Sequence, residues 1–230
     1  MKLLAIETAT EACSAALYID GEITERYQVQ PRKHTELILP MMDELLAQAG
    51  LTLSQLDALA FGRGPGGFTG VRVATGVVQG AAFAADLPVV PVSTLAALAQ
   101  RHFREQGYRR LLPAFDARMG ELYWGGYEVD AEGLVKPTVA DQVASAETVT
   151  LPEGEGWHGV GTGWGSYGDL LVSRMGSALE SVAGELYCSA HDVACLGVAG
   201  FNKGESVGAD QALPVYLRDQ VASKPKSPKV

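Results

Sequence analysis

The stretch "LLAIETATEACSAALYIDGEITERYQV", residues 3–29, decides the fold class of this chain. It holds two runs of β-compatible residues, 3–9 and 13–20, and the second run ends at the hairpin turn signal Asp20-Gly21. The run after that turn, 22–29, alternates with period two. We therefore expect three consecutive antiparallel strands. A Rossmann unit would not begin in this way.

Downstream of these strands, helical and extended patterns alternate. The resulting order β-β-β-α-β-α-β-α is typical of the ribonuclease-H-like α/β unit, from which actin-type and sugar-kinase ATPases are built. Pro40 is expected to kink the first helix or to lie near its start. The expected elements are a helix at 35–49, a strand at 56–62, a helix at 70–86, a strand at 87–92 and a helix at 93–107, with Ser93 or Thr94 as its N-cap.

After residue 107 the pattern weakens. We expect two strands joined near Met119-Gly120, a polar loop-rich segment at 136–156, a strand, glycine turn and helix within 157–171, and a helix at 189–205 that begins near Ser189 or His191. The predicted organisation is an N-terminal lobe at 1–107, a smaller C-terminal lobe at 108–220 and a flexible basic tail at 221–230.

Composition narrows the functional classes. The chain has 230 residues, is 47% hydrophobic and carries a formal net charge of −9. A domain that binds nucleic acid by itself usually has a basic surface, so any contact with nucleic acid is expected to be indirect. Three cysteines without a C-x-x-C pair, no visible signal peptide and no apolar run of membrane-spanning length predict a cytoplasmic protein without membrane contact.

The glycine-rich stretch "FGRGPGGFTGVR", residues 61–72, precedes the second expected helix. Such a turn can bind phosphate through free backbone N–H groups. It has no lysine, which a P-loop needs, and its G-x-G-x-x-G spacing with Asp86 downstream follows three antiparallel strands rather than a Rossmann start. A structural or interface turn is favoured, in which Phe68 and Thr69 fix the helix start, Thr69 as a cap, and Arg72 makes a charged hydrogen bond near a partner surface.

The helix after this turn predicts a docking surface. Gly76 and Gly80 share one face, and glycine is costly within a helix unless another backbone comes close. The helix at 35–49 also has a wider apolar face than one core needs. Burial of both helices within a monomer explains these patterns equally well. The candidate interface residues are His34, Leu37, Ile38, Met41, Met42, Leu45, Phe68, Thr69, Arg72, Val73, Gly76, Val77 and Gly80.

Five motifs, "LLAIETATEACSAAL", "HTELILPMMDELL", "GRGPGGFTGVRVATG", "FDARMGELYW" and "LPVYLRD", together resemble the bacterial TsaB family, also called YeaZ, over nearly the whole chain. This resemblance implies a two-lobed actin-like, sugar-kinase-like ATPase fold, a duplicated ribonuclease-H-like unit with a reduced second lobe. It also implies a non-catalytic subunit in the synthesis of threonylcarbamoyladenosine beside the tRNA anticodon. The implied partners are the catalytic paralogue TsaD, as a heterodimer, and the ATPase TsaE; alone, the protein is expected to form a homodimer through the same helices.

The resemblance also indicates which chemistry is missing. The paralogue's two metal-binding histidines align with Thr94 and Leu98, so no metal site and no catalytic residue are expected. No bound cofactor is expected either. The candidate nucleotide-binding residues are Glu7, Thr8, Thr10, Asp116, Gly161 and Gly163.

Some of these candidate nucleotide-binding residues also have structural interpretations. Gly161 and Gly163 can instead belong to a tight hydrophobic loop with Trp157 and Trp164. Asp116, Arg118 and Glu121 can instead form a structural ion pair at the lobe junction. A stand-alone ATP-binding enzyme of kinase type, or a peptidase of the same fold, is the alternative function. The sequence has no H-E-x-x-H or G-x-S-x-G motif to support it.

Overall fold

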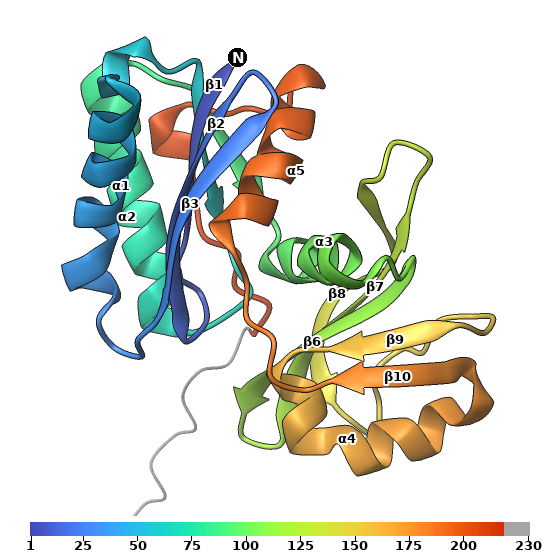
Figure 1. Cartoon of the computed structure of the whole chain (residues 1–230). Coiled ribbons are helices and arrows are strands. Elements are labelled where there is room, and N and C mark those ends of the chain that lie inside the picture. The colour runs from blue at the N-terminus through green and yellow to red at the C-terminus, as the bar shows by residue number, and fades with distance from the viewer. Residues whose placement is uncertain (219–230) are drawn as a thin grey trace, which may run out of the picture.

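The computed structural model describes residues 1–218, so the predicted tail at 221–230 lies outside the described residues. The chain forms two five-stranded mixed sheets, each with helices against it (Figure 1). The first sheet has the order β3-β2-β1-β4-β5, in which β1 pairs antiparallel with β2 and parallel with β4. Its strands are β1 (Lys2–Glu7), β2 (Ala12–Ile19), β3 (Glu22–Val29), β4 (Ala58–Gly62) and β5 (Val89–Val92).

The second sheet repeats this topology. Its order is β10-β9-β6-β7-β8. Strands β6, β7 and β8 are antiparallel neighbours, β9 is parallel to β6, and β10 is parallel to β9. The strands are β6 (Arg110–Arg118), β7 (Glu121–Val129), β8 (Val135–Ser145), β9 (Trp157–Val160) and β10 (Leu179–Ala183). The predicted two-lobed fold with a duplicated ribonuclease-H-like unit is therefore confirmed.

Five α-helices connect these strands within the described part of the chain. They are α1 (His34–Ala49), α2 (Phe68–Ala85), α3 (Thr94–Gln106), α4 (Thr162–Met175) and α5 (Ala190–Asn202), and the short 3-10 turns are η1 (Leu53–Gln55), η2 (Gly176–Ala178) and η3 (Ala209–Gln211). The predicted order of the first eight elements is confirmed. Pro40 lies inside α1, and Ser93 and Ser189 are the N-caps of α3 and α5.

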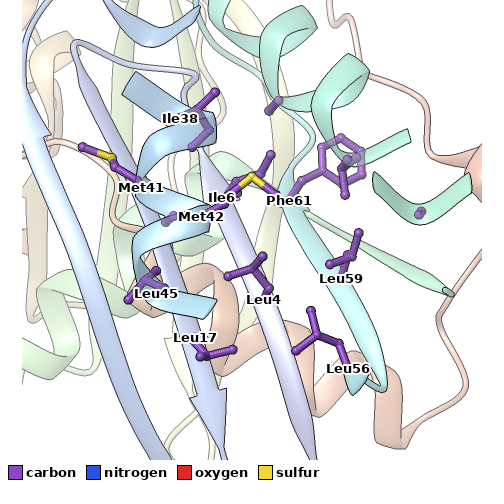
Figure 2. Packing of buried hydrophobic residues seen from close by; sticks show 14 of the residues in the cluster. Leu4, Ile6, Leu17, Ile38, Met41, Met42, Leu45, Leu56, Leu59 and Phe61 are labelled. Atoms are coloured by element: carbon purple, nitrogen blue, oxygen red, sulfur yellow. The ribbon is translucent and has the colours of Figure 1, made fainter. Parts of the chain in front are cut away.

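Strand β1 separates two hydrophobic layers in the first lobe, because neighbouring side chains of a strand point to opposite faces. Leu4 and Ile6 pack against α1 and α2, as Figure 2 shows for the α1 side. Leu3 and Ala5 pack on the opposite face, against α5. The first sheet is thus covered by two consecutive helices on one side and by a helix from the far end of the chain on the other.

Helices α3 and α5 are exchanged between the lobes. Helix α3 follows the first sheet in sequence, but Leu95 and Leu98 pack with residues of β6 and β7 in the second. Helix α5 follows the second sheet, but it packs on β1, β2 and β4 of the first. Arg104 of α3 joins Asp192 of α5 through two hydrogen bonds of 3.0 and 2.9 Å. The helices that pack on each sheet are therefore not separated by a single sequence boundary at residue 107.

Three sequence expectations are wrong. The segment 136–156 contains β8, and β10 was not expected. Helix α2 begins at Phe68 after Gly67, with no side-chain cap, so Thr69 is a helical residue and not its cap. The second lobe is smaller because residues 146–156 connect β8 to β9 without a helix, whereas α1 fills the corresponding connection in the first lobe.

Candidate functional site

The glycine-rich turn lets β4 and α2 approach the β1–β2 turn closely. A Cβ atom at Gly70 would overlap with the carbonyl oxygen of Thr8, and one at Gly66 would come within 2.6 Å of the carbonyl oxygen of Ala9. The Gly64–Pro65 peptide bond is cis, and Gly64 has a φ of 97°, in the region that favours glycine. The glycines are needed for backbone contact within this chain.

The backbone polar groups of the glycine-rich turn are hydrogen-bonded to the β1–β2 turn and to Thr94. The N–H of Gly67 donates to the carbonyl oxygen of Ala9 at 2.7 Å, and the Thr8 hydroxyl donates to the carbonyl oxygen of Gly70 at 2.7 Å. The N–H of Gly64 donates to Thr94 Oγ1 at 3.1 Å. A phosphate would have to displace the first of these bonds, so the geometry supports the structural interpretation of the turn.

Glu7 lies at the base of this corner and is fully buried. Its Oε1 accepts the N–H of Ala9 at 2.5 Å, while Oε2 has no hydrogen-bond partner among the described residues and lies where a side chain at Gly62 would be. Burial raises the pKa of Glu7 to about 7, although hydrogen bonds from the Ala9 and Thr8 backbone act in the opposite direction. Glu7 supports the corner from behind and does not line the cleft beside it.

A cleft of about 1010 Å³ lies between the β1–β2 turn, the starts of α1 and α2, and the end of β6. It contains three of the predicted nucleotide-binding residues, Thr8, Thr10 and Asp116. The Thr10 hydroxyl is buried without a partner in the described structure. Asp116 is paired with Arg118 at 3.0 Å, one of the two interpretations left open by the sequence. The cleft therefore offers hydroxyls, together with a carboxylate that is paired with the exposed Arg118.

Gly161 and Gly163 do not line this cleft. A Cβ atom at Gly161 would come within 2.5 Å of the carbonyl oxygen of Ala114, and one at Gly163 within 2.7 Å of the Ala114 side chain. The neighbouring Trp164 is buried and donates its indole N–H to the carbonyl oxygen of Leu112 at 2.7 Å. These glycines permit close packing of α4 on β6, which agrees with the tight hydrophobic loop.

The C-terminal segment 213–218 spans the two lobes beside the cleft. The N–H of Val215 donates to the carbonyl oxygen of Arg63, and Tyr216 accepts a 2.9 Å hydrogen bond from Arg72 Nε. Arg218 pairs with Glu121 at 2.5 Å in the second lobe. The charged hydrogen bond predicted for Arg72 is thus made within the chain. Glu121 pairs with Arg218 of this segment, whereas Arg118 pairs with Asp116.

Part of the predicted docking surface faces inward. Ile38, Met41, Met42 and Leu45 of α1 are buried in the first-lobe core, at most 4% exposed (Figure 2). Leu37 is half-buried against the same core. These residues hold α1 on the sheet, so the assignment of the four buried side chains to a partner surface is corrected. Leu39 of this helix is a large apolar residue that is exposed.

The outer face of α2 remains open. Gly76 and Gly80 are exposed, and a Cβ atom at either position would have no other atom within 4 Å, so no element among residues 1–218 explains either glycine. Val73 and Val77 are half-buried beside them, and Thr69 and Arg72 are exposed. Phe68 is 52% exposed under the Arg72 guanidinium, 3.5 Å from its ring centroid, and Phe83 is 85% exposed. Phe83 was not among the predicted interface residues, although its position three residues after Gly80 places it on the same face.

His34 lies at the start of α1, where a ring nitrogen is 2.8 Å from the carbonyl oxygen of Thr10. Thr94 and Leu98 are both buried: the Thr94 hydroxyl accepts the Gly64 N–H, and Leu98 packs in the second-lobe core. In residues 1–218 no group of three or more His, Cys, Asp or Glu side chains is arranged to hold a metal. No helix of that region has the length and apolarity needed to cross a membrane.

Comparison with known proteins agrees with this fold and these motifs. The model of the family described as "TsaD: tRNA N6-adenosine threonylcarbamoyltransferase" matches residues 22–225. The chain is 43% identical to the tRNA threonylcarbamoyladenosine biosynthesis protein TsaB of Escherichia coli, covering 97% of both chains. The corresponding TsaB of Haemophilus influenzae is 39% identical over 97% of this chain and 96% of its own.

A solved structure shows the same arrangement of both lobes. The structure described as YeaZ from Pseudomonas aeruginosa superposes with a TM-score of 0.87 at 48% identity, covering 94% of this chain and 99% of that chain. The likeness therefore extends over nearly all of this chain. On this agreement of sequence and structure, the chain belongs to the TsaB (YeaZ) family.

Proposed function

We propose that this protein is a non-catalytic subunit that binds TsaD through the outer face of α2 and the adjoining exposed residues of α1. Together with TsaE, it supports transfer of the threonylcarbamoyl group to the tRNA adenosine next to the anticodon. The supporting observation is the open strip from Phe68 to Phe83, in which Gly76 and Gly80 leave room for another backbone. The net charge of −9 fits a role in which tRNA is contacted mainly by other subunits.

The same strip accounts for a homodimer when the partner is missing. Two copies of a smooth helix face can pack on each other through a twofold axis, because each then presents the same surface to the other. Apolar side chains at both ends of the strip, Phe68 and Phe83, lose their exposure to water in either complex. Homodimer and heterodimer therefore compete for one surface in this proposal.

The test is a charge placed on that face. Gly76→Glu is expected to leave the monomer folded, since its side chain enters open space, and to abolish co-purification with tagged TsaD and restoration of tRNA modification. The matched control is Gly168→Glu, because Gly168 is also a mid-helix glycine with no atom within 4 Å of its Cβ position, but lies on α4 in the second lobe. Retention of TsaD by Gly76→Glu at the level of the control would contradict the proposal.

The cleft favours one second candidate, a stand-alone nucleotide-binding enzyme. Its volume of about 1010 Å³, the unpartnered hydroxyl of Thr10 and the carboxylate of Asp116 support this alternative. Calorimetry of the purified protein with ATP and Mg²⁺ separates the two functions. Tight binding with turnover in the absence of TsaD favours the enzyme, and no turnover favours the subunit.

A further inference from the structure

A second cleft, of about 460 Å³, shares no lining residue with the first. It lies between β5 and α5 on the side of the first lobe and β7 and β8 on the side of the second. Its walls carry both polar and apolar side chains, and one part of them is apolar. The apolar residues include Val90, Val92, Leu134, Val135, Pro137 and Leu196.

A half-buried cation that makes no ion pair within residues 1–218 lines this cleft. Arg63 follows β4, and its backbone is fixed on both sides: its N–H donates to the carbonyl oxygen of Val92 and its own carbonyl oxygen accepts from Val215. The side-chain Nε is buried and has no hydrogen-bond partner, and Arg63 makes no ion pair with any residue in 1–218. An unpaired donor on a charged group is costly in such a place, because it has lost its water without gaining a partner.

The nearest carboxylate of the cleft is already engaged by neutral groups. Asp141 accepts the hydroxyls of Ser93 at 2.6 Å and of Tyr127 at 2.5 Å. Asp141 lies farther than 4.0 Å from the Arg63 guanidinium, although the two charges interact electrostatically. Ser93 and Tyr127 thus hold Asp141 in place, and the donors of Arg63 stay available.

Two more cations line the same cleft. Lys136 of β8 and the exposed Lys203 after α5 both line it, and Lys136 lowers the pKa of Lys203. Lys136 also lies 3.4 Å from Asp130. Glu205 lines the cleft as well. Like charges that line one cleft repel each other, and an anion bound between them would reduce this repulsion.

We propose that this cleft is a binding site for a small organic anion with an apolar body. The carboxylate of the ligand accepts hydrogen bonds from the Arg63 guanidinium, whose planar donors suit a carboxylate. The apolar body packs against the valine and leucine walls, and the Lys136–Lys203 pair adds positive potential. The site joins both lobes, so its occupancy links β4, β5 and α5 to β7 and β8.

The test uses isovalerate, a branched aliphatic carboxylate, and isovaleramide, its neutral analogue of the same shape, with the full-length protein at constant ionic strength. Titration is followed by NMR through the Arg63 side-chain Nε–H and the backbone amides of Ser93 and Leu196. Isovalerate is expected to shift all three signals saturably, and isovaleramide is expected to bind at least tenfold more weakly. Equal effects of the two probes, or no shift at all, would overturn the proposal.

Two variants localise the binding. Arg63→Gln and Lys203→Gln each remove one cation of the cleft, and each is expected to weaken isovalerate binding, the first by tenfold or more. Lys33→Gln, an exposed residue before α1, is the charge-matched control and is expected to bind as the wild type does. Since Lys203 is at the surface, its variant keeps the test decisive if Arg63→Gln fails to fold. The site would be refuted if Lys203→Gln bound isovalerate as the wild type does and Arg63→Gln either did the same or failed to fold.

Discussion

The carboxyl group of Glu7 is buried beneath the glycine corner with one oxygen unpaired. Its pKa is raised from 4.5 to about 7, so between these values the folded chain binds more protons than the unfolded chain. The stability associated with this proton is therefore present at low pH and is lost as the pH rises through about 7. Above this pH the buried negative charge of Glu7 lowers the free energy of unfolding.

Glu7→Gln removes this titration and keeps the oxygen that accepts the Ala9 N–H. We expect the variant to be stabilised relative to wild type by roughly 2–3 kcal/mol at pH 8, and by much less near pH 5, because each pKa unit corresponds to about 1.4 kcal/mol. Urea unfolding at both pH values measures the difference. Glu22→Gln, at an exposed position of β3, controls for the loss of one negative charge. The same stability difference at pH 5 and pH 8 would contradict this assignment.

Two histidines give the opposite trend at lower pH. Burial lowers the pKa of His102 and of His158, which lies stacked on Tyr108 with ring centroids 3.7 Å apart. The unfolded chain takes up these protons more readily, so stability falls as the pH drops below the usual histidine pKa of about 6.5. His102→Gln is expected to reduce this acid-side loss, as measured by the unfolding midpoint between pH 7 and pH 5.

Helices α3 and α5 are joined through one ion pair between an inaccessible carboxylate, Asp192, and the partly exposed Arg104. Arg104→Met leaves Asp192 buried without its cation. We expect the free energy of unfolding to fall by about 3 kcal/mol. This is at the low end of the range for breaking a buried pair, because Arg104 retains some solvent contact. Urea unfolding measures it. Arg26→Met, which breaks an exposed pair with Glu44 at 3.1 Å, is expected to cost less than about 1 kcal/mol.

Sequence patterns predicted those elements whose local signals and tertiary environment agree. Strand β3 was placed to the residue, because the Asp20-Gly21 turn sets its start and alternation sets its length. Strand β8 was missed because it is an edge strand of the second sheet, and only Val135 and Val139 of its residues are buried. Edge strands carry polar residues on exposed positions, so they resemble loops in sequence.

The candidate surfaces were predictable only in part. Helical spacing correctly indicated that α1 is apolar, but it cannot tell a face that packs on the chain's own sheet from one that awaits a partner, and Ile38 and Met41 belong to the former. The charged cleft around Arg63 had no local signal at all. Its residues come from five separate segments that only the folded chain brings together.

At the scale of the whole molecule, the exchanged helices predict that the two lobes unfold together. All three tryptophans, Trp124, Trp157 and Trp164, lie in the second lobe, whereas the thiol of Cys13 is buried in the first. Tryptophan fluorescence and Cys13 labelling, in a variant with Cys188 and Cys195 replaced, therefore report separately on each lobe. We expect coincident urea transitions. Transitions that separate would show that α3 and α5 do not couple the lobes.

The exchange of helices also has a consequence for synthesis of the chain on the ribosome. The first sheet is complete in sequence at Val92, but α5, which covers one of its faces, begins only at Ala190. The ribosome must add nearly one hundred residues in between, which takes about 5–20 s at bacterial elongation rates. During that interval the nascent chain presents Leu3, Ala5 and their neighbours uncovered. This apolar face of the first sheet stays uncovered until α5, the last α-helix of the described chain, has been synthesised.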